Sequence, residues 1–223
     1  DASQALGRLP LAEAVAAADT LTLSPHKAGG PRGVGVLVVK EGRALVPLVR
    51  GGSQELGRRP GTQSPRAVHG AALAIEAAVR ETETRAAAMQ HALDALLAAL
   101  EAPARVLCAG AWRWLPNTRT ISWAPLRADH LLAALDLEGV IASYGAACTS
   151  GAMQASAALL AIGLDAEEAR CCLRLSVGPE LEADFAQAAG AVCSQVVRRC
   201  LSPTMKNAFD SQVERGMVRT TST

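Results

Sequence analysis

The sequence predicts an α/β protein made of two successive α/β segments. Short apolar, β-leaning runs alternate with alanine-rich stretches of helical periodicity near the start of the chain, and the same alternation returns in its second half. A long helical pattern over residues 68–100 separates the two segments. The chain has 223 residues, 50% of them hydrophobic, which is enough to bury a substantial core. This alternation is typical of the α/β class.

In the first segment, glycine and proline residues separate the regular elements. The expected elements are a helix at 11–18, an apolar strand at 20–23, a loop at 24–33, a buried strand at 34–39 and a second loop at 46–65.

The long helix is predicted by apolar residues that recur every three or four positions, and Pro103 ends it. Strands are then expected at 105–108, 118–123, 140–143 and 172–177, and helices at 128–135, 154–162, 166–171 and 181–199. The pattern decays from residue 202 onward.

Charge and cysteine content exclude several classes of function. The net charge is +1 with both signs interspersed, which predicts neither a nucleic-acid nor a membrane partner. No apolar run reaches the length of a membrane span, and no signal peptide is visible. The six cysteines form no CxxC pair and no zinc spacing, so a metal-binding protein is disfavoured. Mostly buried thiols in a reducing cytoplasm are the simplest interpretation.

The loop at residues 24–33 reads Ser-Pro-His-Lys-Ala-Gly-Gly-Pro-Arg-Gly. A pyridoxal 5'-phosphate (PLP) enzyme needs a lysine that forms a Schiff base with the cofactor aldehyde, and nearby donors for its phosphate. Lys27, Ser24 and His26 supply an amine, a hydroxyl and an imidazole. A surface turn with a solvated lysine is the alternative.

The full run resembles the lysine signature of the class V aminotransferase group, which includes the cysteine desulfurases (NifS/IscS-like). This resemblance implies an α/β protein containing the back part of a PLP fold type I large domain at residues 1–83. A smaller α/β C-terminal domain at residues 84–223 would carry the catalytic cysteine loop.

The opening residues, Asp-Ala-Ser-Gln-Ala-Leu-Gly, resemble a segment that this family places ahead of the lysine. The resemblance implies that Asp1 pairs with the pyridinium nitrogen of PLP and that Gln4 bonds the ring hydroxyl. A buried carboxylate there would keep the ring protonated. A helix N-cap is the alternative.

Residues 51–62 resemble the glycine–arginine loop of the family. The resemblance implies that Thr62 reaches the PLP phosphate of the opposite subunit, and therefore a homodimer. Ser53 and Leu56 depart from the pattern, and Leu56 replaces an arginine that would anchor the loop. An ordinary basic loop is the alternative.

Residues 143–151, Ser-Tyr-Gly-Ala-Ala-Cys-Thr-Ser-Gly, resemble the loop that holds the sulfur-accepting cysteine. Cys148 is the candidate nucleophile, because a reactive thiol must be exposed and partly ionised. The other five cysteines lie on apolar patterns and are expected in the core.

The run Leu-Arg-Leu-Ser-Val-Gly at 173–178 resembles another family motif. Arg174 is the candidate ligand for the substrate α-carboxylate, since its planar fork suits that group. A structural salt bridge with a glutamate such as Glu168 is the alternative.

Together the resemblance implies a cysteine desulfurase that converts L-cysteine to L-alanine and leaves a persulfide on Cys148 for acceptors such as an iron–sulfur scaffold protein. Two alternatives remain: a selenocysteine lyase or other class V PLP enzyme, and an inactive fragment that serves in dimerisation or binding.

The chain opens at Asp1 without a methionine, and no segment matches the family's upstream phosphate loop or ring-stacking histidine. We therefore expect a truncated chain that is not active alone.

Overall fold

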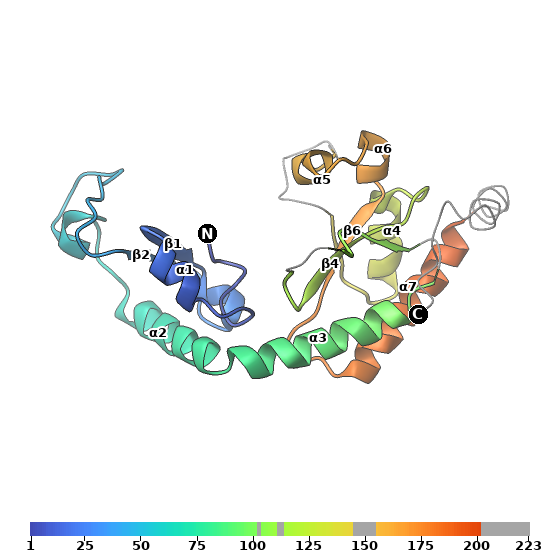
Figure 1. The fold of residues 1–223 in the computed structure, drawn as a ribbon, viewed down its shortest axis with the longest axis horizontal. Coiled ribbons are helices and arrows are strands. Elements are labelled where there is room, and N and C mark those ends of the chain that lie inside the picture. Colours follow the sequence, from blue (N-terminus) through green and yellow to red (C-terminus); the bar gives the residue numbers. More distant parts are fainter. Residues whose placement is uncertain (102–103, 111–113, 145–154, 202–223) are drawn as a thin grey trace. The chain divides into compact units, whose positions relative to one another are not determined.

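The computed structural model describes residues 1–101, 104–110, 114–144 and 155–201 (Figure 1). The chain divides into two compact units, Asp1–Ala87 and Ala88–Thr223.

The first unit pairs a small sheet with two helices. Its elements are α1 (Ala12–Ala17), β1 (Thr20–Leu23), the 3-10 helix η1 (Pro25–Ala28), β2 (Val36–Val39), the 3-10 helix η2 (Gln54–Gly57), α2 (Pro65–Arg80) and the first residues of α3 (Thr82–Ala98). β1 and β2 are antiparallel, with Thr20 opposite Val39. The predicted strand at 20–23 is confirmed.

The core of this unit joins the first residues of the chain to β1 and α2. Leu6, Leu21, Leu23 and Ala78 are all buried. Gly7 has a φ of 71°, and a Cβ there would lie 3.2 Å from the Cβ of Ala78. The N-terminal turn can approach α2 this closely because residue 7 is a glycine.

The prediction of a buried strand at residues 34–39 is wrong in part. β2 covers only Val36–Val39, and the side chains of Leu37 and Val38 are 45% and 38% exposed. Among the described residues β2 pairs with β1 alone, so its outer edge and surface have no covering element.

The prediction of one continuous helix over 68–100 is also wrong. Two helices, α2 and α3, meet at Glu81, whose φ of −102° and ψ of 9° are not helical. The hydroxyl of Thr82 donates to the carbonyl of Ala78 at 2.7 Å. A threonine that bonds the carbonyl four residues earlier competes with the backbone amide and bends a helix. The hydrophobic periodicity runs through the break and does not reveal it.

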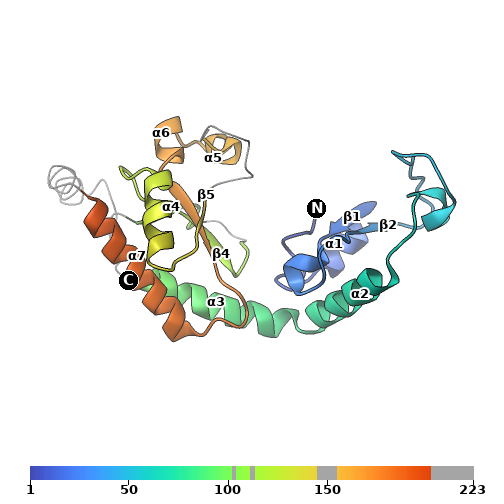
Figure 2. The same ribbon diagram turned by 180° about the vertical axis from the view of Figure 1, so that it is seen from behind.

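The second unit is built on a four-stranded antiparallel sheet of order β3-β4-β6-β5. Its strands are β3 (Arg105–Val106), β4 (Thr118–Ser122), β5 (Ser143–Tyr144) and β6 (Cys172–Ser176). Its helices are the rest of α3, α4 (Ala128–Leu137), α5 (Ala157–Ala161), α6 (Ala166–Ala169) and α7 (Ala183–Cys200) (Figure 2).

The predicted strands at 118–123 and 172–177 and the helices at 128–135 and 181–199 are confirmed within a few residues. The strand expected at 140–143 begins instead at Ser143 and is short. The helices expected at 154–162 and 166–171 are shorter, and residue 154 lies outside the described residues.

The two faces of the β6 strand differ. Leu173, Leu175 and Val177 are buried in a core shared with α3, α4 and α7. On the opposite face Cys172 is covered by residues of α5 and α6, whereas Arg174 and Ser176 are exposed. Side chains alternate between the faces of a strand, so the alternating pattern leaves part of one sheet face open.

Candidate active site

The carboxylate of Asp1 lies beside the end of β1. Its Oδ1 atom accepts a hydrogen bond from the backbone N–H of Ser3 at 2.8 Å and another from the hydroxyl of Thr22 at 3.0 Å. The N–H of Ala2 donates to the carbonyl of Thr22. Within the described part of the chain the Oδ2 atom has no partner, so one carboxylate oxygen stays available for a ligand.

The residues after β1 fold into η1, which carries Lys27. Ser24 precedes the helix, and the N–H of Lys27 donates to the Ser24 carbonyl at 3.0 Å. Gly29 ends the turn with a φ of 95°, in the left-handed region that favours glycine. A Cβ on Gly30 would lie 2.9 Å from the Cβ of Pro25. The segment expected as a loop is therefore a tight turn, called here the lysine turn (residues 24–30).

Side-chain hydrogen bonds join the N-terminal turn to the lysine turn. The hydroxyl of Ser24 donates to the hydroxyl of Ser3 at 3.0 Å. Arg8 donates through Nη1 to the carbonyl of Gln4 and through Nη2 to the carbonyl of Lys27, both at 3.0 Å. The turn that begins the chain therefore lies directly against the turn that carries the lysine.

The side chains on these two turns are accessible. Asp1, Gln4, His26 and Lys27 are exposed, and Ser24 is half-buried. Among the described residues the amine of Lys27 has no hydrogen bond or ion pair. An accessible amine, a carboxylate with a free oxygen, and hydroxyl and imidazole groups are the groups that PLP requires. The residues present thus fit that cofactor.

Within residues 1–101 and the other described parts of the chain, no hydrogen bond joins Thr62 to this group. It is exposed, and the glycine–arginine loop is held by its own contacts. The N–H of Gly61 donates to Oε1 of Gln54 at 3.2 Å, and Arg59 donates to the Gly61 carbonyl at 2.9 Å. Leu56, which replaces the family's arginine, is 87% exposed with a φ of 58°. The role of Thr62 stays a prediction.

Arg174 lies in the second unit, on the open face of the sheet. It is flanked by Thr120 of β4 and Ser143 of β5, and its Nη2 donates to the Ser143 hydroxyl at 3.3 Å. In the described residues it has no carboxylate partner. A guanidinium that is exposed and bonded only to a hydroxyl can still accept a carboxylate ligand.

The alternative of a salt bridge between Arg174 and Glu168 is wrong. Glu168 pairs with Arg105 of β3, and it also accepts a weak hydrogen bond from Ser122. Arg105 and Arg174 lie on the same face of the sheet. Arg105 is in register with Ser122 and Cys172, and Cys172 packs against Ala169 of α6, so Arg105 is the arginine nearer to Glu168. Arg174 is exposed although β6 lies between β4 and β5, because its side chain points to the open face of the sheet while Leu173 and Leu175 are buried on the other face.

Cys148 lies outside the described residues, so its predicted role stays untested. Among the other cysteines, Cys171, Cys172 and Cys193 are buried as expected. Burial raises the pKa of each of these thiols, and it raises the pKa of Cys193 to about 11. They are inert as nucleophiles near neutral pH.

The prediction that all five other cysteines lie in the core is wrong for Cys108 and Cys200, which are exposed. Cys108 follows β3 with a φ of 56°, and Cys200 is the last residue of α7. Each of these two cysteines lies at the end of an apolar sequence pattern, where the buried part of the element stops.

A cavity of about 340 Å³ lies beside α4, and none of the expected site residues that the structure describes lines it. In the part of the chain that is described, no cluster of three or more His, Cys, Asp or Glu could hold a metal ion. No helix of that same part is both long and apolar enough to cross a membrane.

A profile of the Aminotransferase class-V family matches residues 1–184. The chain belongs to the class V aminotransferase family. An IscS-like cysteine desulfurase of Mycobacterium tuberculosis is 36% identical over 202 residues, which are 89% of this chain and 51% of that protein. The chain thus spans about half the length of the curated relatives it matches.

This class V aminotransferase chain is also similar to solved structures of related proteins. A NifS-like protein is similar with a TM-score of 0.78 and 28% identity, over 89% of this chain and 52% of that one. SspA in complex with cysteine is similar with a TM-score of 0.61 and 28% identity, over 80% of this chain and 49% of that one. The predicted α/β fold and the predicted resemblance to cysteine desulfurases are confirmed.

Three residues of this class V aminotransferase chain contact the site segments but were not predicted from the sequence: Thr22, Arg8 and Arg85. Thr22 bonds the carboxylate of Asp1, and the arginines bond carbonyls of the lysine turn. Thr22 lies in the strand that the sequence predicts at residues 20–23, so its position near the site could have been inferred. No local sequence pattern links Arg85 to a turn 57 residues earlier.

Proposed function

We propose that the protein is a PLP-dependent cysteine desulfurase, which takes sulfur from L-cysteine and releases L-alanine. The observation that carries the proposal is the junction of two turns: the lysine turn, which carries an accessible amine, is hydrogen-bonded to the N-terminal turn, which carries an oriented carboxylate. The similarity to cysteine desulfurases and to SspA in complex with cysteine supports the choice of substrate.

In this proposal Lys27 would hold the cofactor aldehyde through its amine, and Ser24 and His26 would donate to the phosphate. With the cofactor bound, the free Oδ2 of Asp1 would pair with the ring nitrogen, Gln4 would bond the ring hydroxyl, and Thr62 would reach the phosphate of the opposite subunit of a homodimer. Bound PLP supplies an electron sink for the substrate carbons. Residues 1–83 then belong to the cofactor domain, and residues 84–223 form the small domain.

The chain's own residues perform the remaining steps. Arg174 binds the α-carboxylate of cysteine and orients the substrate. Once released, the amine of Lys27 takes the α-proton. The thiolate of Cys148 attacks the substrate sulfur: a sulfur–sulfur bond forms, and the bond from sulfur to the β-carbon breaks. The β-carbon keeps that electron pair and is protonated, so alanine leaves and a persulfide stays on Cys148.

The persulfide sulfur then passes to an acceptor thiol, such as that of an iron–sulfur scaffold protein. Transfer of this kind requires reduced thiols, which agrees with a cytoplasmic location. Among the described residues no cysteine pair is disulfide-bonded, and five are free.

The test is the Cys148→Ala variant of the full-length protein, assayed for alanine and persulfide formed from L-cysteine. We expect the variant to keep the yellow colour of bound PLP and to lose alanine release by about a hundredfold or more, because the attacking thiolate is gone.

Cys108→Ala is the matched control, since Cys108 is exposed but has no role in the proposal. It should turn over at the wild-type rate. Retained turnover in Cys148→Ala would refute the role of Cys148. A wild-type protein that stays colourless with added PLP would refute the enzyme itself. Faster turnover of selenocysteine than of cysteine would favour a selenocysteine lyase.

A further inference from the structure

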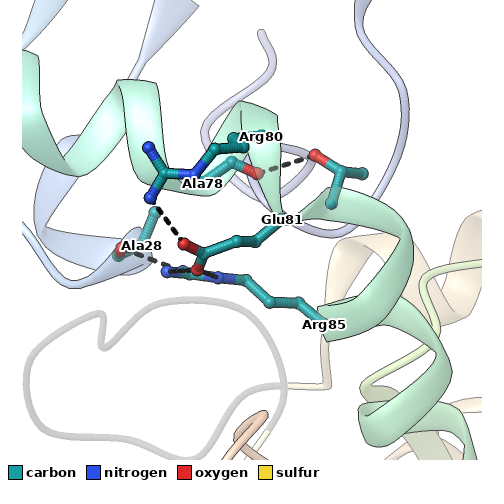
Figure 3. A network of polar contacts seen from close by, with 6 residues as sticks. Ala28, Ala78, Arg80, Glu81 and Arg85 are labelled. Carbon is teal, nitrogen blue, oxygen red and sulfur yellow. Dashed lines mark hydrogen bonds and ion pairs between the residues drawn. The ribbon is translucent and has the colours of Figure 1, made fainter.

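Two arginines donate hydrogen bonds to consecutive carbonyls of the lysine turn. Nη2 of Arg8 donates to the carbonyl of Lys27 at 3.0 Å. Nη1 of Arg85 donates to the carbonyl of Ala28 at 3.4 Å (Figure 3). Arg8 comes from the N-terminal turn and Arg85 from the first residues of α3. Two separate segments of the first unit therefore hold the same stretch of backbone.

These carbonyls are the ones that the turn itself leaves free. Inside the turn the N–H of Lys27 uses the carbonyl of Ser24, and the N–H groups of Gly29 and Gly30 both use the carbonyl of Pro25. The last carbonyls of any helix lack partners within it. The arginines thus complete bonds that η1 cannot make.

Arg85 is held in place by Glu81 at the junction of α2 and α3. Its Nε and Nη2 both donate to Oε2 of Glu81, at 3.1 and 2.8 Å, while Arg80 donates to Oε1 at 2.8 Å (Figure 3). Hydrogen bonds from Arg80 and then Arg85 lower the pKa of the Glu81 carboxyl. The bonds to Glu81 therefore fix the orientation of the Arg85 guanidinium, which leaves its Nη1 to donate to the carbonyl of Ala28.

Arg8 is half-buried and has no carboxylate partner among the described residues. Its Nε is buried without a hydrogen-bond partner, and burial lowers the pKa of its guanidinium. Burying a charged group with an unsatisfied donor is costly. Its two bonds go to the carbonyls of Gln4 and Lys27, one on each turn of the candidate site.

We propose that Arg8 and Arg85 are positioning residues that fix the backbone of the lysine turn, each from a different segment of the first unit. The inference rests on the proposed function, which explains why the position of the turn matters. In every catalytic cycle the amine of Lys27 must leave the cofactor and return to the same atom. Carbonyl bonds fix the main chain at Lys27 and Ala28 while the lysine side chain stays free to move.

The test compares Arg85→Met with Arg80→Met in the full-length protein. Both arginines pair with Glu81, but only Arg85 contacts the lysine turn. The first measurement is amide hydrogen exchange in cofactor-free protein. We expect the amides of Lys27 and Gly30 to exchange about tenfold faster in Arg85→Met, because a hydrogen bond from a charged donor is lost. In Arg80→Met they should stay within about twofold of wild type.

The second measurement is the rate at which PLP is captured at Lys27, trapped by borohydride reduction. We expect a loss of about tenfold in Arg85→Met, none in Arg80→Met, and partial recovery in Arg85→Lys, whose single ammonium cannot serve Glu81 and Ala28 together. Arg8→Lys provides a second, milder variant should Arg85→Met fail to fold. Equal exchange in the Arg85 and Arg80 variants would overturn the inference.

The two proposals fail in different ways. A wild-type protein that captures no PLP would refute the proposed function, and the exchange measurement would still decide whether the arginines hold the turn. Normal capture and exchange in the Arg8 and Arg85 variants would leave the function intact and refute the positioning role.

Discussion

The described neighbours of the Arg174 guanidinium carry hydroxyl groups rather than carboxylates. Thr120 and Ser143 flank it across the sheet, and Ser143 accepts its one hydrogen bond within the described residues. A neutral partner costs little to displace, so the guanidinium is available to bind an anion. The neighbouring Arg105 is different, because Glu168 already neutralises it.

We predict that Arg174→Met raises the KM for L-cysteine by about 10- to 100-fold, with a smaller change in kcat, since a charge-assisted pair with the substrate is lost. Steady-state alanine release measures both constants. Arg105→Met is the control, with a KM within about threefold of wild type. An unchanged KM in Arg174→Met would mean that the substrate carboxylate binds elsewhere.

Cys193 predicts a pH dependence of stability. Its thiol has an ordinary pKa of 9.0, and burial in the core raises the value to about 11. The protonated thiol is therefore favoured by folding: the contribution is complete below about pH 9 and is lost as the pH rises toward 11.

Denaturant unfolding at pH 8 and pH 10.5 should show a larger loss of stability in wild type than in Cys193→Ala. The difference between the two proteins removes the effect of other groups that titrate in the same range. Identical losses would show that Cys193 is ionised, or free to ionise, in the folded protein.

Motifs identify the candidate reactive residues but not their neighbours. Asp1, Ser24 and Lys27 are recognisable because the family pattern is local in sequence. Arg8 and Arg85 act on the lysine turn from 19 and 57 residues away. Which guanidinium reaches which carbonyl depends on packing between segments, and no sequence spacing encodes it.

At the scale of elements, α3 and α7 approach unusually closely. A Cβ on Gly190 of α7 would lie 2.3 Å from the carbonyl oxygen of Leu96 and 2.9 Å from the Cβ of Ala99. Four positions later, Ser194 accepts from the N–H of Glu101 and donates to the carbonyl of Ala99. The glycine allows the contact, and the serine satisfies backbone groups at the end of α3.

We predict that Gly190→Ala destabilises the protein by about 1–3 kcal/mol, because the added methyl group forces the two helices apart. Thermal or denaturant unfolding measures the change. Gly110→Ala is the matched control, since a Cβ there meets nothing within 4 Å. A stabilised Gly190→Ala variant, as expected for alanine in an unhindered helix, would contradict the close approach.

Element prediction succeeds where periodicity and packing agree. β1, β4, β6, α4 and α7 match expectation because each buries a regular apolar pattern. The break at Glu81 was missed since it depends on one hydroxyl, that of Thr82. The exposure of β2 was missed because β-branched residues look alike whether or not another element covers them.

At the scale of the whole molecule, the class V aminotransferase fold was recognisable from motifs that cover most of the chain. The motif residues fall in both units: the lysine turn in the first and Arg174 in the second. The chain spans about half the length of its relatives, so assays belong to the full-length protein.

The central claim is that the amine of Lys27 binds the aldehyde of PLP. The most direct measurement incubates the protein with PLP, reduces it with borohydride and maps the modified peptide by mass spectrometry. This chain has three lysines, Lys27, Lys40 and Lys206, so the assignment within it is unambiguous. We predict a pyridoxyl group on Lys27, retained in Lys40→Ala and absent in Lys27→Ala. Modification of another lysine, with Lys27 unmodified, would contradict the account.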